Sequence, residues 1–329
     1  MVRRQPIGDG DPLSEPHDLG SGAASELVPC SLSALAEPLP GTAPHAPAWV
    51  LVEHPGPWAR DAVAGASWPD GLGVAVREAA EAAGVRVVLA RRHRARPTDR
   101  SVTQPRVVVA RMGPGGWTAT LGLTDIHDLA GLDWAELAGG ERIPRGWRDA
   151  GPSWAVCTHG VRDACCARWG RPLAAALSAA SSDGVWEISH TGGHRFAGVL
   201  VALPEGTVYG RVAAGHVPDL LRARARSEVV PRLLRGRSHL APWQQAAEAA
   251  LRRHLDEPGL DAFTPRAAHP LPSGAIRTVW AGGGQTEWWV DVVTAVVPER
   301  RTSCGVRPEP GTTWTAASPV EVRRLAATE

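Results

Sequence analysis

The middle of this chain gathers most of its sulfur beside two closely spaced histidines, and this feature constrains the chain more than any other. The stretch WAVCTHGVRDACC carries Cys157, Cys165 and Cys166, three of the five cysteines. The stretch WEISHTGGHRF follows and places His190 and His194 four residues apart. Because thiolates and imidazoles are common ligands of zinc and iron, we expect two ligand loops that close on one metal centre.

The spacing within each stretch defines the expected site more closely. Cys157 and Cys166 lie nine residues apart, and the two histidines flank Thr191-Gly192-Gly193. Two glycines disfavour a helix there and favour a turn that lets backbone and imidazoles approach a metal closely. Two thiolates and two imidazoles suit either a four-coordinate zinc or a 2Fe–2S cluster with cysteines on one iron and histidines on the other. The spacing alone does not choose between these two centres.

Two other readings of the cysteines stay open at this point. The segment from Cys157 to His159 resembles the first arm of a Rieske site, but neither Cys165 nor Cys166 has a histidine three residues later to form the second arm. The adjacent cysteines, Cys165 and Cys166, could instead form a redox pair, although adjacent cysteines rarely close an unstrained disulfide.

The sequence says less about the roles of the residues around the predicted ligands. Arg162 and Asp163 either form a surface ion pair of little energetic value or order the ligand loop and tune the metal. Cys30 and Cys304 are expected to be buried or incidental, with a small chance that they meet in space.

Length and charge limit the classes of protein that remain. A chain of 329 residues exceeds one typical core, so two or three domains are expected. The net charge of +1 gives no reason to expect nucleic acid or a membrane as partner. The N-terminal sequence MVRRQPIGDGDPLSEP lacks the apolar segment of a secretory signal. We therefore expect a cytoplasmic location, where clustered cysteines more often bind metals than form disulfides.

The pattern of apolar residues and turn signals predicts an α/β protein of several units. The predicted units are a disordered tail (1–25), an N-terminal α/β domain (26–150), a thioredoxin-like domain (151–238) and a smaller C-terminal α/β extension (239–329). In the third unit, two strands over residues 154–157 and 185–189 deliver the two ligand loops.

Three local predictions bear on the surroundings of the site. Gly170-Arg171-Pro172 predicts the start of a helix over residues 173–180, because proline is tolerated in a first helical turn. Helical segments are expected over residues 217–226 and 228–234. Loop and a short helix are expected after Arg300.

Four motifs together resemble the sucrase/ferredoxin-like family of thioredoxin-like ferredoxins. They are VCTHGVRDACCARWGRPL (156–173), VWEISHTGGHRFAG (185–198), VYGRV (208–212) and RLLRGRS (232–238). The resemblance extends more weakly to GTAPHAPAWVLVEHPGPW (41–58) and covers most of residues 28–255.

The resemblance implies a 2Fe–2S cluster held by two cysteines and two histidines. Carried onto this sequence, the ligands would be Cys157, Cys166, His190 and His194, with Cys165 as a possible replacement for its neighbour. The protein would then carry single electrons between redox donor and acceptor proteins that the sequence does not name. No pair of carboxylates suggests glycoside hydrolysis. The rivals are a structural zinc module in an interaction protein and a thiol oxidoreductase that uses one of the adjacent cysteines.

Overall fold

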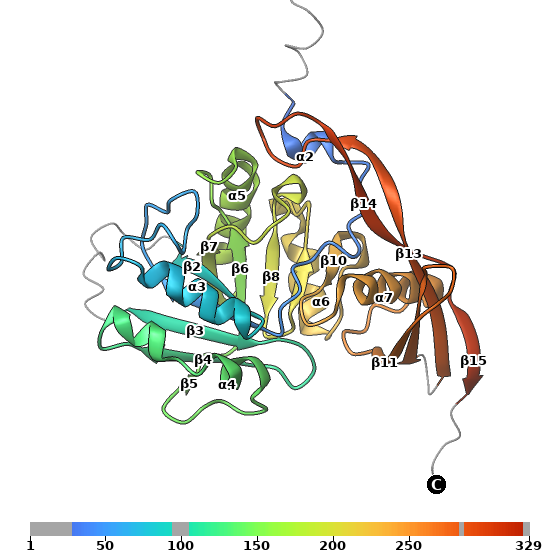
Figure 1. Cartoon of the computed structure of the whole chain (residues 1–329), viewed down its shortest axis with the longest axis horizontal. Coiled ribbons are helices and arrows are strands. Elements are labelled where there is room, and N and C mark those ends of the chain that lie inside the picture. The colour runs from blue at the N-terminus through green and yellow to red at the C-terminus, as the bar shows by residue number, and fades with distance from the viewer. Residues whose placement is uncertain (1–27, 94–104, 283–285, 325–329) are drawn as a thin grey trace, which may run out of the picture.

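The chain has a mixed α/β fold with two β-sheets, which confirms the predicted class. A computed structural model describes residues 28–93, 105–282 and 286–324 (Figure 1). The predicted N-terminal tail, residues 1–25, lies outside the described residues. Within the described part of the chain, no helix combines the length and the apolar character needed to cross a membrane.

The first sheet has ten strands in the order β10-β9-β8-β6-β7-β2-β1-β3-β4-β5. The strands are β1 Ala48–Glu53, β2 Val85–Arg92, β3 Arg106–Arg111, β4 Trp117–Gly122, β5 Arg148–Asp149, β6 Ser153–Cys157, β7 Gly184–Ile188, β8 Leu200–Leu203, β9 Thr207–Tyr209 and β10 Leu234–Arg237. Two of the strand pairs, β1 with β2 and β6 with β7, are parallel, and the others are antiparallel.

A single pairing joins the two halves of this sheet. Strand β7 pairs with β2, and Ala90 lies opposite Ile188. The strands of the region 26–150 and those of the region 151–238 therefore form one continuous sheet. Three buried tryptophans lie on its central strands. Trp154 packs with Leu173 and Leu177, whereas Trp49 and Trp186 belong to a separate core cluster built mainly from strand residues.

The helices beside the first sheet are α3 Leu72–Ala82, α4 Trp134–Gly139, α5 Ala164–Ala180 and α6 Val217–Ala225. The prediction of a helix beginning near Pro172 is wrong, since α5 starts at Ala164 and Pro172 lies inside it. Asp163 explains the earlier start, because its side chain caps the helix. Pro172 is exposed, so water can satisfy the carbonyl that the missing N–H leaves free.

The C-terminal part forms a second sheet against helix α7 (Pro242–Leu255). The strands are β11 Phe263–Pro270, β12 Ile276–Gly282, β13 Thr286–Arg300, β14 Glu309–Ala316 and β15 Val320–Arg324. The order is β11-β12-β13-β14, and β15 also pairs with β13. Leu251 of α7 packs with Trp280 and Val290 in the core between helix and sheet.

Two sequence predictions fail in the C-terminal half. Strands β14 and β15 replace the loop and short helix expected after Arg300, and a 3₁₀ turn followed by β10 replaces most of the helix expected over 228–234. The long β13–β14 ribbon reaches across the molecule to α2 (Cys30–Ser33), where the Arg301 N–H donates to Ser33 Oγ at 3.0 Å (Figure 1).

Candidate metal centre

The two predicted ligand loops leave the first sheet side by side. Cys157 is the last residue of β6 and lies opposite Ile188, the last residue of β7. The Thr158 N–H then donates to the Ile188 carbonyl at 3.1 Å. Because parallel strands end at the same edge of a sheet, His190, two residues beyond β7, is brought beside Cys157.

The first turn of α5 supplies the other cysteines. Asp163 accepts a hydrogen bond from the Cys165 N–H at 2.9 Å and so fixes the start of the helix. Successive residues of a helix point about 100° apart. Cys166 therefore faces Cys157 and His190, whereas Cys165 faces a different set of side chains.

The structure brings three of the four predicted ligands into one compact set. The ligand atoms of Cys157, Cys166 and His190 all lie within 4.8 Å of one another. Cys166 Sγ is 3.8 Å from His190 Nδ1. His194 joins on the far side of His190, with its Nδ1 3.2 Å from His190 Nε2. We call these four residues the Cys2His2 group.

A hydrogen bond between the two buried thiols shifts their pKa values in opposite directions. Both Cys157 and Cys166 are 1% exposed. The hydrogen bond from the Cys166 thiol lowers the pKa of Cys157 well below its usual value, and the same bond together with burial raises the pKa of Cys166. The pair therefore holds one thiolate and one proton, and a bound metal would replace that proton.

The histidines are also suited to binding metal. Burial lowers the pKa of His194, which favours the neutral ring that metals bind. His194 Nε2 is buried without a hydrogen-bond partner among the described residues, and the nearest carboxylate oxygen, Asp163 Oδ2, is 3.7 Å away. Nε2 thus faces Asp163, and it is the other ring nitrogen, Nδ1, that lies toward His190.

The turn between the histidines depends on its two glycines. Gly192 and Gly193 have φ values of 91° and 73°, which side chains rarely adopt. Arg235 donates to the Gly192 carbonyl at 3.3 Å and also bonds Thr42. Its guanidinium fills the space that a Cβ atom on Gly193 would need. Burial lowers the pKa of Arg235 to about 9, and the side chain acts as a brace for the turn.

The predicted neighbours of the ligands take separate positions. His159 accepts a hydrogen bond from the His190 N–H on its Nδ1 at 3.2 Å and packs edge-on against Trp58. Arg162 lines a pocket beside the site, and its carbonyl accepts from Arg60. His159 therefore orients the backbone of a predicted ligand.

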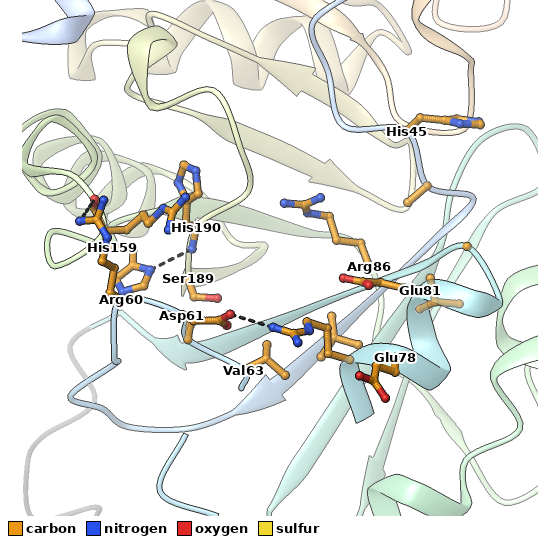
Figure 2. A pocket seen from close by; sticks show the side chains of 17 residues that line it. His45, Arg60, Asp61, Val63, Glu78, Glu81, Arg86, His159, Ser189 and His190 are labelled. Atoms are coloured by element: carbon orange, nitrogen blue, oxygen red, sulfur yellow. Dashed lines mark hydrogen bonds and ion pairs between the residues drawn. The ribbon is translucent and has the colours of Figure 1, made fainter. Parts of the chain in front are cut away.

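A pocket of about 690 Å³ opens beside the Cys2His2 group (Figure 2). His190 and His159 lie at one end, and Arg86 reaches into it from β2. Glu78 and Glu81 of α3 line another part of its wall. Half-buried His190 is the only member of the group among the described lining residues, so it is the route by which the pocket reaches the site.

A second set of possible ligands was not anticipated as a site. Cys30, Asp163, Cys165 and Cys304 each offer a ligand atom, and these atoms lie within 4.8 Å of one another. We call them the Cys3Asp group. Cys165, considered above as an alternative ligand of the first site, belongs to this set in the structure. No local spacing could have revealed it, because Cys30 and Cys304 are 274 residues apart.

Comparison with known proteins gives one match. No curated protein and no solved structure matches the chain. A family model described as sucrase/ferredoxin-like matches residues 39–236, more than half of the chain. The matched segment includes the whole Cys2His2 group but excludes Cys30 and Cys304. The chain therefore belongs to the sucrase/ferredoxin-like family.

Proposed function

We propose that this protein is a one-electron carrier whose Cys2His2 group, Cys157, Cys166, His190 and His194, holds a 2Fe–2S cluster. The observation that carries the proposal is the convergence of two buried thiols and two imidazoles at the common edge of β6 and β7. Membership of the sucrase/ferredoxin-like family supports it.

The donor set fits such a cluster. The two sulfurs lie on one side of the group, and the His190 Nε2 and His194 Nδ1 atoms form a separate pair 3.2 Å apart. Two nitrogens on one tetrahedral ion with bonds near 2.0 Å would be about 3.3 Å apart. This division suits a 2Fe–2S cluster with sulfur ligands on one iron and nitrogen ligands on the other, and a cluster of this kind takes up and gives up one electron.

The protein's own residues would shield, hold and connect this centre. Burial of Cys157 and Cys166 keeps water from the sulfurs, and Arg235 fixes the glycine turn. His190 faces the pocket, so we propose that redox donor and acceptor proteins exchange electrons with the centre on that face. All five cysteines are free thiols, which is consistent with a reducing compartment such as the cytoplasm.

A single zinc ion is the second candidate, because one observation favours it. Cys166 Sγ and His190 Nδ1 are 3.8 Å apart, and both lie within 4.8 Å of Cys157 Sγ. A sulfur and a nitrogen bound to one tetrahedral zinc ion would be about 3.5 Å apart. A zinc module would serve an interaction protein rather than an electron carrier.

A thiol oxidoreductase has less support. Its nucleophile would be Cys165 or Cys166, and each is 1% exposed. A substrate disulfide needs an accessible thiolate, which neither residue offers.

Spectroscopy of anaerobically purified protein tests the proposal. We expect visible absorption, a paramagnetic signal after one-electron reduction, and about two iron atoms and two sulfide ions per chain. The Cys157→Ser variant should lose the colour. A colourless wild-type protein with zinc at this site would overturn the electron-carrier proposal in favour of the zinc module.

A further inference from the structure

A second group of metal-ligating side chains lies at the same end of α5, on a different face of that helix. We propose that Cys30, Cys165, Cys304 and Asp163 bind a structural zinc ion. This site is separate from the Cys2His2 group and does not depend on the identity of the metal held there.

Three segments distant in sequence build the Cys3Asp group. Cys30 begins α2, Cys165 lies in the first turn of α5, and Cys304 lies in the connection between β13 and β14. The sequence separations are 135 residues from Cys30 to Cys165 and 139 residues from Cys165 to Cys304. In Figure 1, α2 and the β13–β14 connection lie together near the end of α5.

The spacing of the sulfur atoms matches one tetrahedral ion. The Sγ atoms of Cys30 and Cys165 are 3.6 Å apart, those of Cys165 and Cys304 are 3.4 Å apart, and those of Cys304 and Cys30 are 3.7 Å apart. With Zn–S bonds near 2.3 Å, the sulfurs of a tetrahedral site would be about 3.8 Å apart. The three thiols thus form a nearly equilateral triangle of the required size.

Asp163 supplies the fourth ligand. Its Oδ1 and Oδ2 atoms are 3.6 and 3.7 Å from Cys30 Sγ, whereas zinc would set a sulfur and an oxygen about 3.5 Å apart. The Ser303 hydroxyl and the Cys304 N–H donate to Oδ2 at 2.9 and 2.7 Å, and the Cys165 N–H donates to Oδ1. These bonds orient the carboxylate. Oδ2 accepts two of them and Oδ1 only one, so Oδ1 keeps a lone pair for a metal.

The group concentrates negative charge where no fixed cation balances it. Asp163 is 4% exposed, and its carboxylate is held by the Cys165 and Cys304 N–H groups and the Ser303 hydroxyl. Cys30 and Cys165, beside it, are 0% and 1% exposed. Within the described chain, no arginine lies within ion-pair distance of Asp163, and its one basic partner at that distance is His194, with Nε2 3.7 Å from Oδ2. A divalent cation would supply the missing positive charge.

Other uses of these residues fit the geometry less well. A disulfide between two of the cysteines would leave the third thiol and the buried carboxylate without a role. Each iron of an iron–sulfur cluster binds at most two cysteine sulfurs, so three sulfurs that all lie within 3.7 Å of one another do not fit such a cluster. Four protein ligands leave no open position on the metal, and this arrangement is typical of structural zinc rather than catalytic zinc.

The proposed ion would fasten two peripheral segments to the core. Helix α2 and the β13–β14 ribbon would be tied to the start of α5, the helix that also carries Cys166. Because metal binding to such a site contributes to folding free energy, zinc would stabilise the contact between the N- and C-terminal parts of the described chain.

Metal analysis of the full chain, produced with zinc in the medium, tests the site. We expect about one zinc ion per chain in this site. In the double variant Cys30→Ser/Cys304→Ser, the zinc content of this site should fall at least tenfold, and the metal of the Cys2His2 group should be retained. The exposed Val306, on the same β13–β14 connection, provides a matched control, because Val306→Ala should keep the zinc. The double variant Cys157→Ser/Cys166→Ser should lose the other metal and keep this zinc.

These outcomes separate the two proposals. A wild-type protein with two zinc ions and no iron would overturn the electron-carrier proposal but would support this site if Cys30→Ser/Cys304→Ser removes one of them. Unchanged zinc in that variant, or a wild-type protein without zinc, would overturn the site.

Should the Cys30→Ser/Cys304→Ser variant fail to fold, X-ray absorption at the zinc edge decides the question. The measurement uses the Cys157→Ser/Cys166→Ser variant, or the wild-type protein if its other site holds iron. Three sulfur neighbours and one oxygen neighbour are expected, and two sulfurs with two nitrogens would refute the assignment.

Discussion

Two adjacent cysteines of α5 belong to two groups of very different construction. Cys166 joins the Cys2His2 group, whose members come from one stretch of sequence between Cys157 and His194. Cys165 joins the Cys3Asp group, which also draws on Cys30 and Cys304 at opposite ends of the described chain. One helical step of about 100° is enough to direct neighbouring thiols to different sites.

The groups also differ in their access to solvent. His190 connects the Cys2His2 group to a pocket of about 690 Å³. No member of the Cys3Asp group lines this pocket, and Cys30 and Cys165 are 0% and 1% exposed, while Cys304 is half-buried. A centre that exchanges electrons must be accessible to a partner protein. A structural metal ion needs only a complete set of protein ligands that shields it from solvent. This difference in access agrees with the proposed electron exchange at the first group and the proposed structural ion at the second.

Replacing each of the two adjacent cysteines with serine, in separate variants, should change the metal content most and should test the comparison most clearly. Cys166→Ser should remove most of the iron and visible colour while leaving the zinc in place. Cys165→Ser should remove the zinc and leave the colour, because its sulfur points to the other group. Iron, sulfide and zinc analysis of each purified variant measures both results. Loss of colour from Cys165→Ser alone would show that the two roles are reversed.

The next largest effect is expected from Glu37, a buried carboxylate that links the histidine turn of the Cys2His2 group to the β13–β14 ribbon. Glu37 accepts hydrogen bonds from Arg195, which follows His194, and from Arg300, which lies at the end of β13. Glu37→Gln leaves the buried Arg300 and the half-buried Arg195 with less charge compensation, so we expect the free energy of unfolding to fall by about 3 kcal/mol. Denaturant unfolding measures this change, with the exposed Glu78→Gln as a control that should shift it by less than about 0.5 kcal/mol.

The same carboxylate predicts a dependence of stability on pH. Burial opposes ionisation of Glu37, but Arg195 and Arg300 lower its pKa below the usual 4.5. Its stabilisation should therefore be complete above pH 4.5 and should disappear as the pH falls through the lowered value. Both metals should remain bound to Glu37→Gln at neutral pH. Selective loss of zinc there would show that the Cys3Asp group depends on this bridge.

The sequence revealed the first group because its chemistry is local. The strands that end at Cys157 and Ile188 follow from apolar runs, and the glycine turn between the histidines is visible in the letters themselves. The start of α5 was missed because Pro172 suggested a first turn, although Asp163 already provided a capping residue. Without that start, the different directions of Cys165 and Cys166 could not be predicted.

The second group was hidden because it depends on tertiary structure. Cys30 and Cys304 meet only after the β13–β14 ribbon crosses to α2. The sequence predicted no ribbon there, since Pro310 and Gly311 interrupt the alternation of β14. Long-range strand pairing of this kind leaves no periodic signal in the sequence from which the contact between two distant cysteines could be predicted.

Replacing one imidazole with a thiolate should sharpen the redox side of the comparison. In His194→Cys, an anionic ligand replaces a neutral one, which disfavours the reduced form. We expect the reduction potential to fall by about 100 mV or more, toward the value near −400 mV of all-cysteine plant-type ferredoxins. Spectroelectrochemical titration measures it. His159→Gln serves as the control, since His159 contacts the His190 backbone only, and a shift of equal size in both variants would remove His194 from the ligand set.

The smallest expected effect concerns a cation that faces only the first group. Arg86 lines the pocket beside His190, and its charge interacts with the Cys157 thiolate. In Arg86→Gln, loss of this cation should lower the reduction potential by tens of millivolts, because added negative charge becomes harder to accommodate. Arg60→Gln, at an exposed position on the same pocket, should change it less, since water and salt screen that charge. Zinc content should be the same in both variants. Equal potentials in Arg86→Gln and the wild type would mean that the pocket is electrically isolated from the centre, and the route for electron exchange would then have to be sought on another face.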